Sequence, residues 1–267
     1  MSPNTSKSSA FTLVEVLVVI AIIAILMAIL MPALRAARDR GARLHCASNT
    51  RTLLVAWFMY AQDHNYRLVN PKVKSEGAIR ASNEPLPWVL VPDSSYASLK
   101  EKMEAIKKGA LFPYVSKSIE VYRCPADQRI RGLLAASYRT YSIIDGAGGG
   151  SWPGHVSIQN MTEIKRPAEK YIFVEDYDPR GMNLGSWTMD IAGQAWVDPL
   201  ALWHGPRTTL GFADLHVELH PWHDNSFIRW CRSGIDQPGS FSFGMRPPED
   251  DRQDLDCMIR YFVRRSP

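Results

Sequence analysis

Residues 11–31 read FTLVEVLVVIAIIAILMAILM, and only Thr12 and Glu15 in this stretch are not apolar. At about 1.5 Å per residue, a helix of this length spans roughly 31 Å, the thickness of the hydrocarbon core of a bilayer. A core helix of a soluble domain would carry a polar face at the helical period, and this stretch has none. A cleaved secretory signal would have a shorter apolar region, of about 7–15 residues, before a small-x-small site, which Met31-Pro32-Ala33 matches poorly. We therefore expect a transmembrane helix at residues 11–32.

The average composition of the chain hides this span. Of 267 residues, 46% are hydrophobic and 22% are charged, which is ordinary for a folded domain and excludes a disordered chain. The net charge of +4 is too small to indicate nucleic-acid binding without a clustered basic patch. Neither a Gly-x-Ser-x-Gly motif nor a phosphate-binding glycine loop is present, so we expect no enzymatic activity and no nucleic-acid partner.

Glu15 is the one acidic residue of the apolar stretch. A carboxylate within hydrocarbon costs on the order of a few kcal/mol, so such a residue is by default a functional hypothesis that needs a named partner. A free α-amine would be a suitable partner, and cleavage of the chain just before Phe11 would create one. Ala10, on the other side of that bond, is small enough for the pocket of a peptidase.

The segment Ala10-Phe11-Thr12-Leu13-Val14-Glu15, followed by the unbroken apolar run, resembles the processing site of type IV prepilins and type II secretion pseudopilins. The resemblance implies cleavage between Ala10 and Phe11 by a prepilin peptidase, N-methylation of Phe11, and a kink at Pro32. It implies that Glu15, at the fifth mature position, neutralises the amine of a neighbouring subunit during assembly. The family usually has Gly before the cut, where this chain has Ala10.

The same resemblance implies a structural subunit of a type II secretion or type IV pilus-like assembly. Its partners would be other pilin-like subunits, the prepilin peptidase/methyltransferase and the inner membrane, with residues 1–10 as a cytoplasmic leader and a periplasmic or extracellular head. Five arginines follow the span and by charge alone favour the opposite orientation: Arg35, Arg38, Arg40, Arg43 and Arg51. We side with the family topology, because long translocated domains override flanking charge. The alternative function is a membrane-tethered surface module that binds glycan, DNA or protein without forming a filament.

Beyond the span, apolar residues recur at the spacing of one helix face: Leu53, Leu54, Trp57, Phe58 and Ala61. We therefore expect residues 33–64 to continue the helix with an amphipathic face. Short strand-like runs separated by turns follow, so residues 65–267 are predicted to form a globular head with an antiparallel sheet. The predicted fold class is α+β and pilin-like, with the long N-terminal helix packed on that sheet.

Local signals position the elements of the head. Residues 65–95 are rich in Pro, Asn and Ser and predict a long loop, and Ser98 with Glu101 forms a capping box before a helix at about 98–108. Leu255–Val263 fits either a helix or an edge strand. The predicted strands are Ile119–Arg123, Tyr138–Ile144, Tyr171–Glu175, Gln194–Val197, Thr208–Ala213 and Leu215–Leu219.

Four further stretches resemble a pilin-like subgroup abundant in planctomycetes. They are the segment that begins Cys46-Ala47-Ser48-Asn49, the Arg-Cys-Pro-x-Asp element within Tyr122–Asp127, the stretch Arg166–Asp176, and His204 followed ten residues later by Asp214. In the subgroup the last element is His, nine residues, then Asp-Gly. Leu215 replaces that Gly here, and Leu takes a positive φ much less readily.

Two groups of residues could hold a metal ion. His204, Asp214 and His216 carry donors that suit Zn²⁺, although a simple hydrogen bond between His204 and Asp214 that holds a hairpin is the favoured interpretation. Glu175, Asp176 and Asp178 offer the oxygen ligands that Ca²⁺ prefers, and a solvated turn is the favoured interpretation there. We expect no cofactor.

Cysteine and tryptophan leave alternatives open. The four cysteines allow three pairings, and an exported head would meet an oxidising compartment. Buried free thiols are the favoured interpretation, and if a disulfide forms, Cys231 with Cys257 is the favoured pair. Five tryptophans could form either a sugar-binding platform or, as we favour, part of the core: Trp152, Trp187, Trp196, Trp203 and Trp222.

Overall fold

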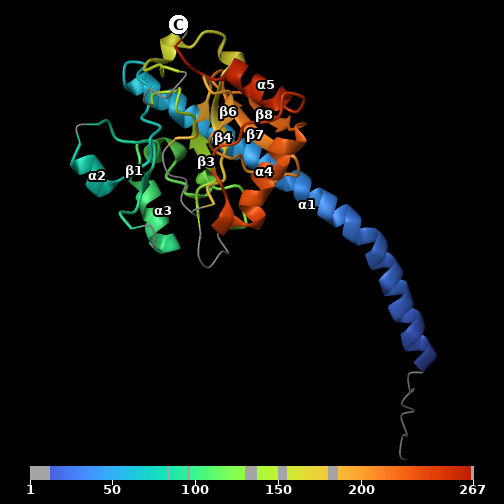
Figure 1. Cartoon of the computed structure of the whole chain (residues 1–267). Helices are drawn as coiled ribbons and strands as arrows, with labels where there is room; N and C mark the ends of the chain where they lie inside the picture. Colours follow the sequence, from blue (N-terminus) through green and yellow to red (C-terminus); the bar gives the residue numbers. More distant parts are fainter. Residues whose placement is uncertain are drawn as a thin grey trace, which may run out of the picture. The chain divides into compact units, whose positions relative to one another are not determined.

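The computed structural model describes residues 13–82, 84–94, 97–129, 137–149, 155–179 and 186–265. The chain divides into two compact units, residues 1–41 and 42–267. Helix α1, Leu13–Asp63, begins in the first unit and ends in the second (Figure 1). The second unit holds an antiparallel sheet with further helices, so the predicted α+β fold with a long N-terminal helix is confirmed.

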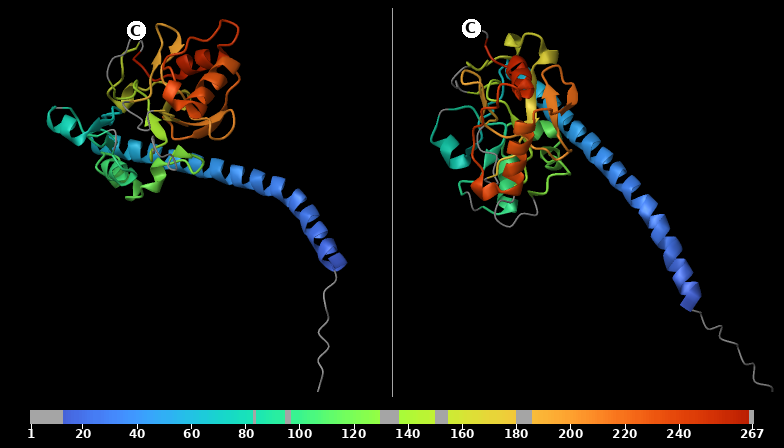
Figure 2. Two further views of the ribbon diagram at one scale, coloured as in Figure 1. Left: turned by 60° about the horizontal axis from the view of Figure 1, so that its bottom comes forward. Right: turned by 45° about the vertical axis from the view of Figure 1, so that its right-hand side comes forward.

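The described part of the first unit is the N-terminal part of α1, residues 13–41, which is apolar over residues 13–31. Every residue from Leu13 to Gly41 is exposed, including large apolar side chains such as Leu13 at 80% and Ile29 at 72%. Among the residues described, α1 is the one helix that is long and apolar enough to cross a membrane. It remains helical through Pro32, and its N-terminal half is curved (Figure 2). A proline ring clashes with the preceding turn of a helix, which is the physical reason to expect a kink at Pro32. The kink itself stays a prediction.

The second unit is built on a four-stranded sheet with the order β3-β4-β7-β8, in which all neighbours are antiparallel. Its strands are β3 Tyr141–Ile143, β4 Tyr171–Glu175, β7 Arg207–Phe212 and β8 Val217–Pro221. Every residue of β3 and β4 is buried, which fits the apolar and aromatic run Tyr171–Val174 in β4. Two smaller pairs accompany the sheet: β1 Lys74–Ser75 with β2 Leu90–Val91, and β5 Met189–Asp190 with β6 Ala195–Trp196.

The C-terminal half of α1 packs on this sheet with one face. The buried residues recur every three or four positions: Cys46, Asn49, Thr50, Leu53, Leu54, Ala56, Trp57 and Ala61. A Cβ atom at Gly211 of β7 would lie 2.7 Å from the Thr50 side chain and 2.9 Å from that of Leu54. The missing side chain of Gly211 therefore lets the backbones of α1 and β7 approach closely.

Helices α2 Glu76–Arg80, α3 Leu99–Lys107, α4 Asn225–Asp236 and α5 Gln253–Tyr261 complete the head. The capping box of Ser98 and Glu101 begins α3 as predicted. Helices α4 and α5 cap one another: Asp254 accepts from the backbone N–H of His223 and Asp224, and Asp224 accepts from those of Gln253 and Asp254. Short 3₁₀ turns lie between these elements: Phe112–Val115, Glu120–Tyr122, Met161–Glu163, Pro167–Glu169 and Pro238–Ser240.

Two sequence predictions differ from the structure, and the structure decides a third that the sequence leaves open. Ile119–Arg123 is not a strand but holds the 3₁₀ turn Glu120–Tyr122, because Pro125 follows and cannot donate to a sheet ladder. The region 65–95 contains β1, α2 and β2 rather than an uninterrupted loop. Of the two alternatives for Leu255–Val263, the helix is observed.

Of the five tryptophans singled out in the sequence, the four that the structure describes lie wholly or partly within the core. Trp187, Trp196 and Trp222 are buried and pack edge to face in sequence, and Trp203 is partly buried. Trp152 lies outside the described residues. The described tryptophans therefore offer no open sugar-binding platform.

We expect Gly211→Ala to destabilise the head by about 1–3 kcal/mol, because the new methyl group collides with two side chains of α1. Thermal unfolding of the full chain in detergent, followed by near-UV circular dichroism, measures the change. Gly239→Ala is the matched control, since a Cβ atom there meets nothing within 4 Å. Equal stability of the two variants would contradict the proposed close contact between α1 and β7.

Candidate functional site

The apolar half of α1 is the first candidate for function. Glu15 lies in the first turn of this helix, and it is exposed among apolar side chains. Ala10 and Phe11, which the sequence predicts as the processing site, lie outside the described residues. The structure therefore shows the helix on which the motif acts but not the cleavage site itself.

The second candidate lies where α1 meets the sheet, and it joins two of the stretches singled out in the sequence. Cys46 of α1 forms a disulfide with Cys124, 78 residues later, with 5.3 Å between the Cα atoms. One turn further along α1, the side-chain amide of Asn49 donates to the carbonyl of Arg123 at 2.9 Å and to that of Glu120 at 3.4 Å. The Cys46–Asn49 and Arg123–Asp127 stretches thus fasten α1 to the head.

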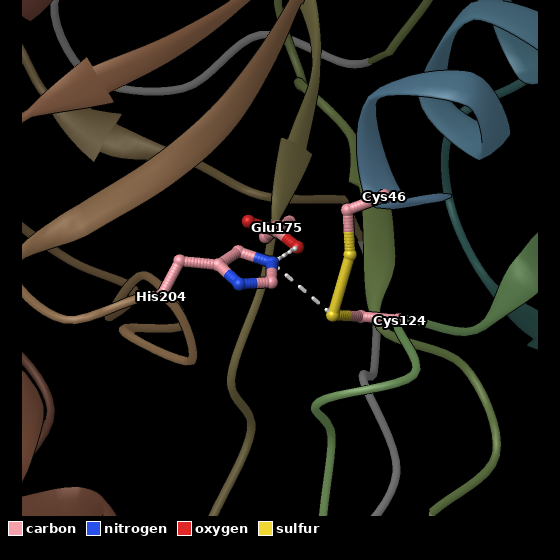
Figure 3. A group of neighbouring side chains, drawn as sticks. All are labelled: Cys46, Cys124, Glu175 and His204. Atoms are coloured by element: carbon pink, nitrogen blue, oxygen red, sulfur yellow. Dashed lines mark hydrogen bonds and ion pairs between the residues drawn. A yellow bond between two sulfur atoms is a disulfide. The ribbon is translucent and has the colours of Figure 1, made fainter. Parts of the chain in front are cut away.

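Glu175 and His204 complete a cluster around this disulfide, which we call the Cys–His–Glu cluster (Cys46, Cys124, Glu175 and His204; Figure 3). The imidazole Nε2 of His204 lies 3.4 Å from Cys124 Sγ and 3.5 Å from Glu175 Oε1. All four residues are buried, and one ligand atom from each lies within 4.8 Å of the others.

Glu175 has two unlike oxygens. Its Oε2 accepts a hydrogen bond from the backbone N–H of Thr209 at 2.7 Å. Its Oε1 is buried and has no hydrogen-bond partner among the described residues, apart from the ion-pair approach of His204. A buried oxygen without a hydrogen bond destabilises the folded state by about 1–3 kcal/mol. Glu175 Oε1 is therefore a candidate ligand atom.

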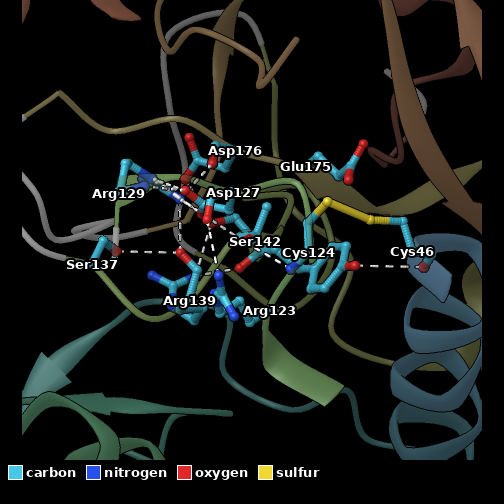
Figure 4. A network of polar contacts seen from close by, with 12 residues as sticks. Cys46, Arg123, Cys124, Asp127, Arg129, Ser137, Arg139, Ser142, Glu175 and Asp176 are labelled. Atoms are coloured by element: carbon cyan, nitrogen blue, oxygen red, sulfur yellow. Dashed lines mark hydrogen bonds and ion pairs between the residues drawn. A yellow bond between two sulfur atoms is a disulfide. The ribbon is translucent and has the colours of Figure 1, made fainter. Parts of the chain in front are cut away.

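A buried network of acidic and basic side chains adjoins the cluster (Figure 4). The carboxylate of Asp127 accepts from Arg129 Nη2 at 2.7 Å and from the hydroxyl of Thr140 at 2.7 Å. Arg139 donates to the hydroxyl of Ser142 at 2.8 Å, which in turn donates to Asp176 Oδ2 at 2.7 Å. Such charge-assisted bonds satisfy ions that would otherwise be expensive to bury.

Burial shifts two pKa values in this network. It raises the pKa of Asp176 to about 6, with the charge of Asp178 acting in the same direction. It also lowers the pKa of Arg139 to about 10, against the attraction of Asp176. Both residues are nearly inaccessible, so burial dominates over their partners.

The structure corrects both groups of predicted metal ligands. His204 lies in the Cys–His–Glu cluster, whereas Asp214 lies in the β7–β8 turn and contacts His216 Nδ1 at 2.5 Å. The predicted hydrogen bond between His204 and Asp214 is therefore not formed, and the trio with His216 is not assembled. Glu175, Asp176 and Asp178 are buried, so the predicted solvated turn is also wrong.

The turn after Asp214 shows how the backbone accommodates Leu215 in place of glycine. Leu215 adopts φ = 73°, in the left-handed region, and its N–H donates to the carbonyl of Phe212 at 2.9 Å. Its carbonyl accepts from Arg51 Nη1 of α1 at 3.0 Å. The chain thus keeps the turn that Gly would favour while holding Leu at a strained φ.

The predicted pairing of Cys231 with Cys257 is wrong, because both are free thiols. Cys231 is buried in α4, where burial raises its pKa well above the ordinary value. Cys257 of α5 instead lines a surface groove with His216 and His220. No local signal in the sequence identifies Cys46 and Cys124 as the pair, since they lie in different elements far apart in the chain.

Comparison with known proteins bears on the first candidate only. Residues 5–31 match the family described as the Prokaryotic N-terminal methylation motif. No curated protein and no solved structure matches the chain. The motif is prepilin-type and coincides with the exposed apolar helix, so together they support a type IV pilin-like or pseudopilin-like class: a prepilin-like subunit with a single-pass membrane anchor.

We expect the variant Leu215→Gly to be more stable than Leu215→Ala by about 1–2 kcal/mol, because both remove the side chain but only Gly relieves the left-handed φ. Thermal unfolding of the two variants compares them directly. An Ala variant as stable as the Gly variant would show that the turn is not strained.

We expect Asp176 to make the head less stable as pH rises from about 4 to about 6. Its pKa is about 6 in the folded state against an ordinary value of 3.8, so the folded state holds the proton more tightly. Its contribution is present below pH 4 and lost above pH 6, with a size on the order of 2–3 kcal/mol. Denaturant unfolding of wild type and Asp176→Asn at several pH values isolates this contribution. A difference between them that stays constant, or that grows in favour of wild type with rising pH, contradicts the assignment.

Proposed function

We propose that this protein is a pilin-like or pseudopilin-like structural subunit of a type II secretion or type IV pilus-like assembly. It is cleaved between Ala10 and Phe11 by a prepilin peptidase, N-methylated at Phe11, and anchored by residues 11–32. Its leader faces the cytoplasm, and its head lies in the periplasm or outside the cell. The proposal includes membership of the planctomycete-type subgroup with the His204…Asp214 element.

The observation that carries the proposal is the open apolar surface of α1. Residues 13–41 are all exposed, and apolar side chains surround the helix over residues 13–31. Removing one Leu or Ile side chain from water contributes about 1.5–3 kcal/mol. Lipid before assembly, and like helices after it, are the two environments that cover such a surface on every side.

Glu15 gives the packing of these helices a register. Its carboxylate would cost a few kcal/mol in hydrocarbon, and an amine partner offsets this cost. The Phe11 amine of a neighbouring subunit meets Glu15 at one axial offset only, since the apolar residues around it offer no second ion. Lateral packing of the apolar helices then stabilises the assembly, and the ion pair sets the axial offset between neighbouring subunits.

The alternative, a tethered surface module, receives less support from the head. The described tryptophans that could have formed a glycan platform are packed in the core, with Trp187, Trp196 and Trp222 at most 3% exposed. Neutral and acidic side chains hold the buried arginines Arg129 and Arg139, so these two do not contribute to a basic surface.

We expect Glu15→Ala to leave membrane insertion and processing intact and to abolish recovery of assembled subunits. Glu15→Gln, which keeps the size and loses the charge, should behave in the same way. Membrane fractionation, followed by cross-linking between neighbouring subunits, measures the two steps separately. Normal cross-linking of the Gln variant would refute the ion-pair role, and loss of both variants from the membrane would refute the separation of anchoring from assembly.

A further inference from the structure

The Cys–His–Glu cluster has more donors than a structural disulfide needs. A disulfide is complete with two sulfur atoms, yet His204 Nε2 and Glu175 Oε1 both converge on it in a buried space. Burying an imidazole and a half-satisfied carboxylate there is unfavourable unless something binds them. Two sulfurs, one imidazole nitrogen and one carboxylate oxygen are all ligand types that zinc binds, and they number the four that a tetrahedral site requires.

We propose that the dithiol form of this chain binds one Zn²⁺ through Cys46, Cys124, His204 and Glu175. In a tetrahedral zinc site, bond lengths of about 2.0–2.3 Å place neighbouring ligand atoms about 3.3–3.8 Å apart. Two of the required separations are already met, at 3.4 Å from His204 Nε2 to Cys124 Sγ and 3.5 Å to Glu175 Oε1. The two sulfurs ligate once the bond between them is absent.

The surrounding structure orients the ligands. The backbone N–H of Thr209 holds Glu175 Oε2, which leaves Oε1 aimed at His204. Asn49 and Arg123 fix the backbones that carry the two cysteines. Four protein ligands fill the coordination sphere, so the site is structural rather than catalytic.

Zinc and disulfide are alternative states of one site. Binding to the dithiol releases two protons from the thiols and leaves Zn²⁺ held by two thiolates, a neutral imidazole and a carboxylate, a site with a net charge of −1. Thiol–disulfide exchange with an external disulfide then forms the Cys46–Cys124 bond and releases Zn²⁺. The external disulfide accepts two electrons and two protons and leaves as two thiols. Because the cluster is at most 4% exposed, metal entry and thiol–disulfide exchange both require local opening of the head.

The test uses the full chain, produced under reducing conditions and purified in detergent with a phosphine reductant. Thiol counting after denaturation distinguishes the states, with four reactive thiols in the dithiol form and two in the disulfide form. Cobalt(II) is the probe, because thiolate ligation gives a charge-transfer band and a tetrahedral site gives intense visible bands. We expect one Co²⁺ per dithiol chain, displaced by Zn²⁺, and none in the disulfide form.

Variants assign the ligands. Cys46→Ser should weaken the thiolate band, His204→Gln should lower cobalt affinity at least about tenfold, and Cys231→Ser, a thiol outside the cluster, should change neither. Near-UV circular dichroism checks that each variant folds. If a variant does not fold, the comparison of the dithiol and disulfide forms of the wild-type chain still tests the proposal. A dithiol chain that binds no Co²⁺, or a Cys231→Ser variant that loses binding as Cys46→Ser does, would overturn the proposal. These outcomes do not depend on membrane anchoring or assembly.

Discussion

The exclusion of water from the apolar half of α1 is the constraint on which the rest of the molecule depends. From Leu13 to Gly41 the helix exposes every residue, and over residues 13–31 it carries apolar side chains around its whole circumference. No element of the described chain covers that surface, so lipid or another copy of the helix must do so. A prepilin-type motif at residues 5–31 overlaps this helix. Membrane insertion followed by packing against like helices is how proteins with this motif cover such a surface.

The second half of the same helix serves the opposite purpose, since it is the element around which the head is built. Cys46 and Asn49 tie it to the segment before β3, and Gly211 lets it approach β7 closely. Arg51 donates to the carbonyl of Leu215, the residue with a left-handed φ in the β7–β8 turn. Stretches that lie far apart in the sequence therefore meet along α1, where the Cys46 disulfide is buried and the Asn49 hydrogen bonds are partly buried.

Local physics explains what the sequence could predict. The apolar run, the Ser98–Glu101 capping box and the β-branched and aromatic run of β4 each carry their signal within a few residues, and the structure agrees with all three. The cysteine pairing, the partners of His204 and the burial of Asp176 depend on contacts between distant segments, which no local pattern encodes. The predicted strand Ile119–Arg123 is not formed, because Pro125 and the disulfide at Cys124 prevent a sheet ladder there.

Mass spectrometry of the mature N-terminus is the most direct test of the central claim that α1 belongs to a processed, membrane-anchored pilin-like subunit. The wild-type protein would be purified from the membranes of cells that contain a prepilin peptidase. The account predicts an N-terminal peptide that begins at Phe11 and carries one N-methyl group. A chain that still begins at Met1, or one cleaved after the apolar run so that the helix is lost, would contradict it.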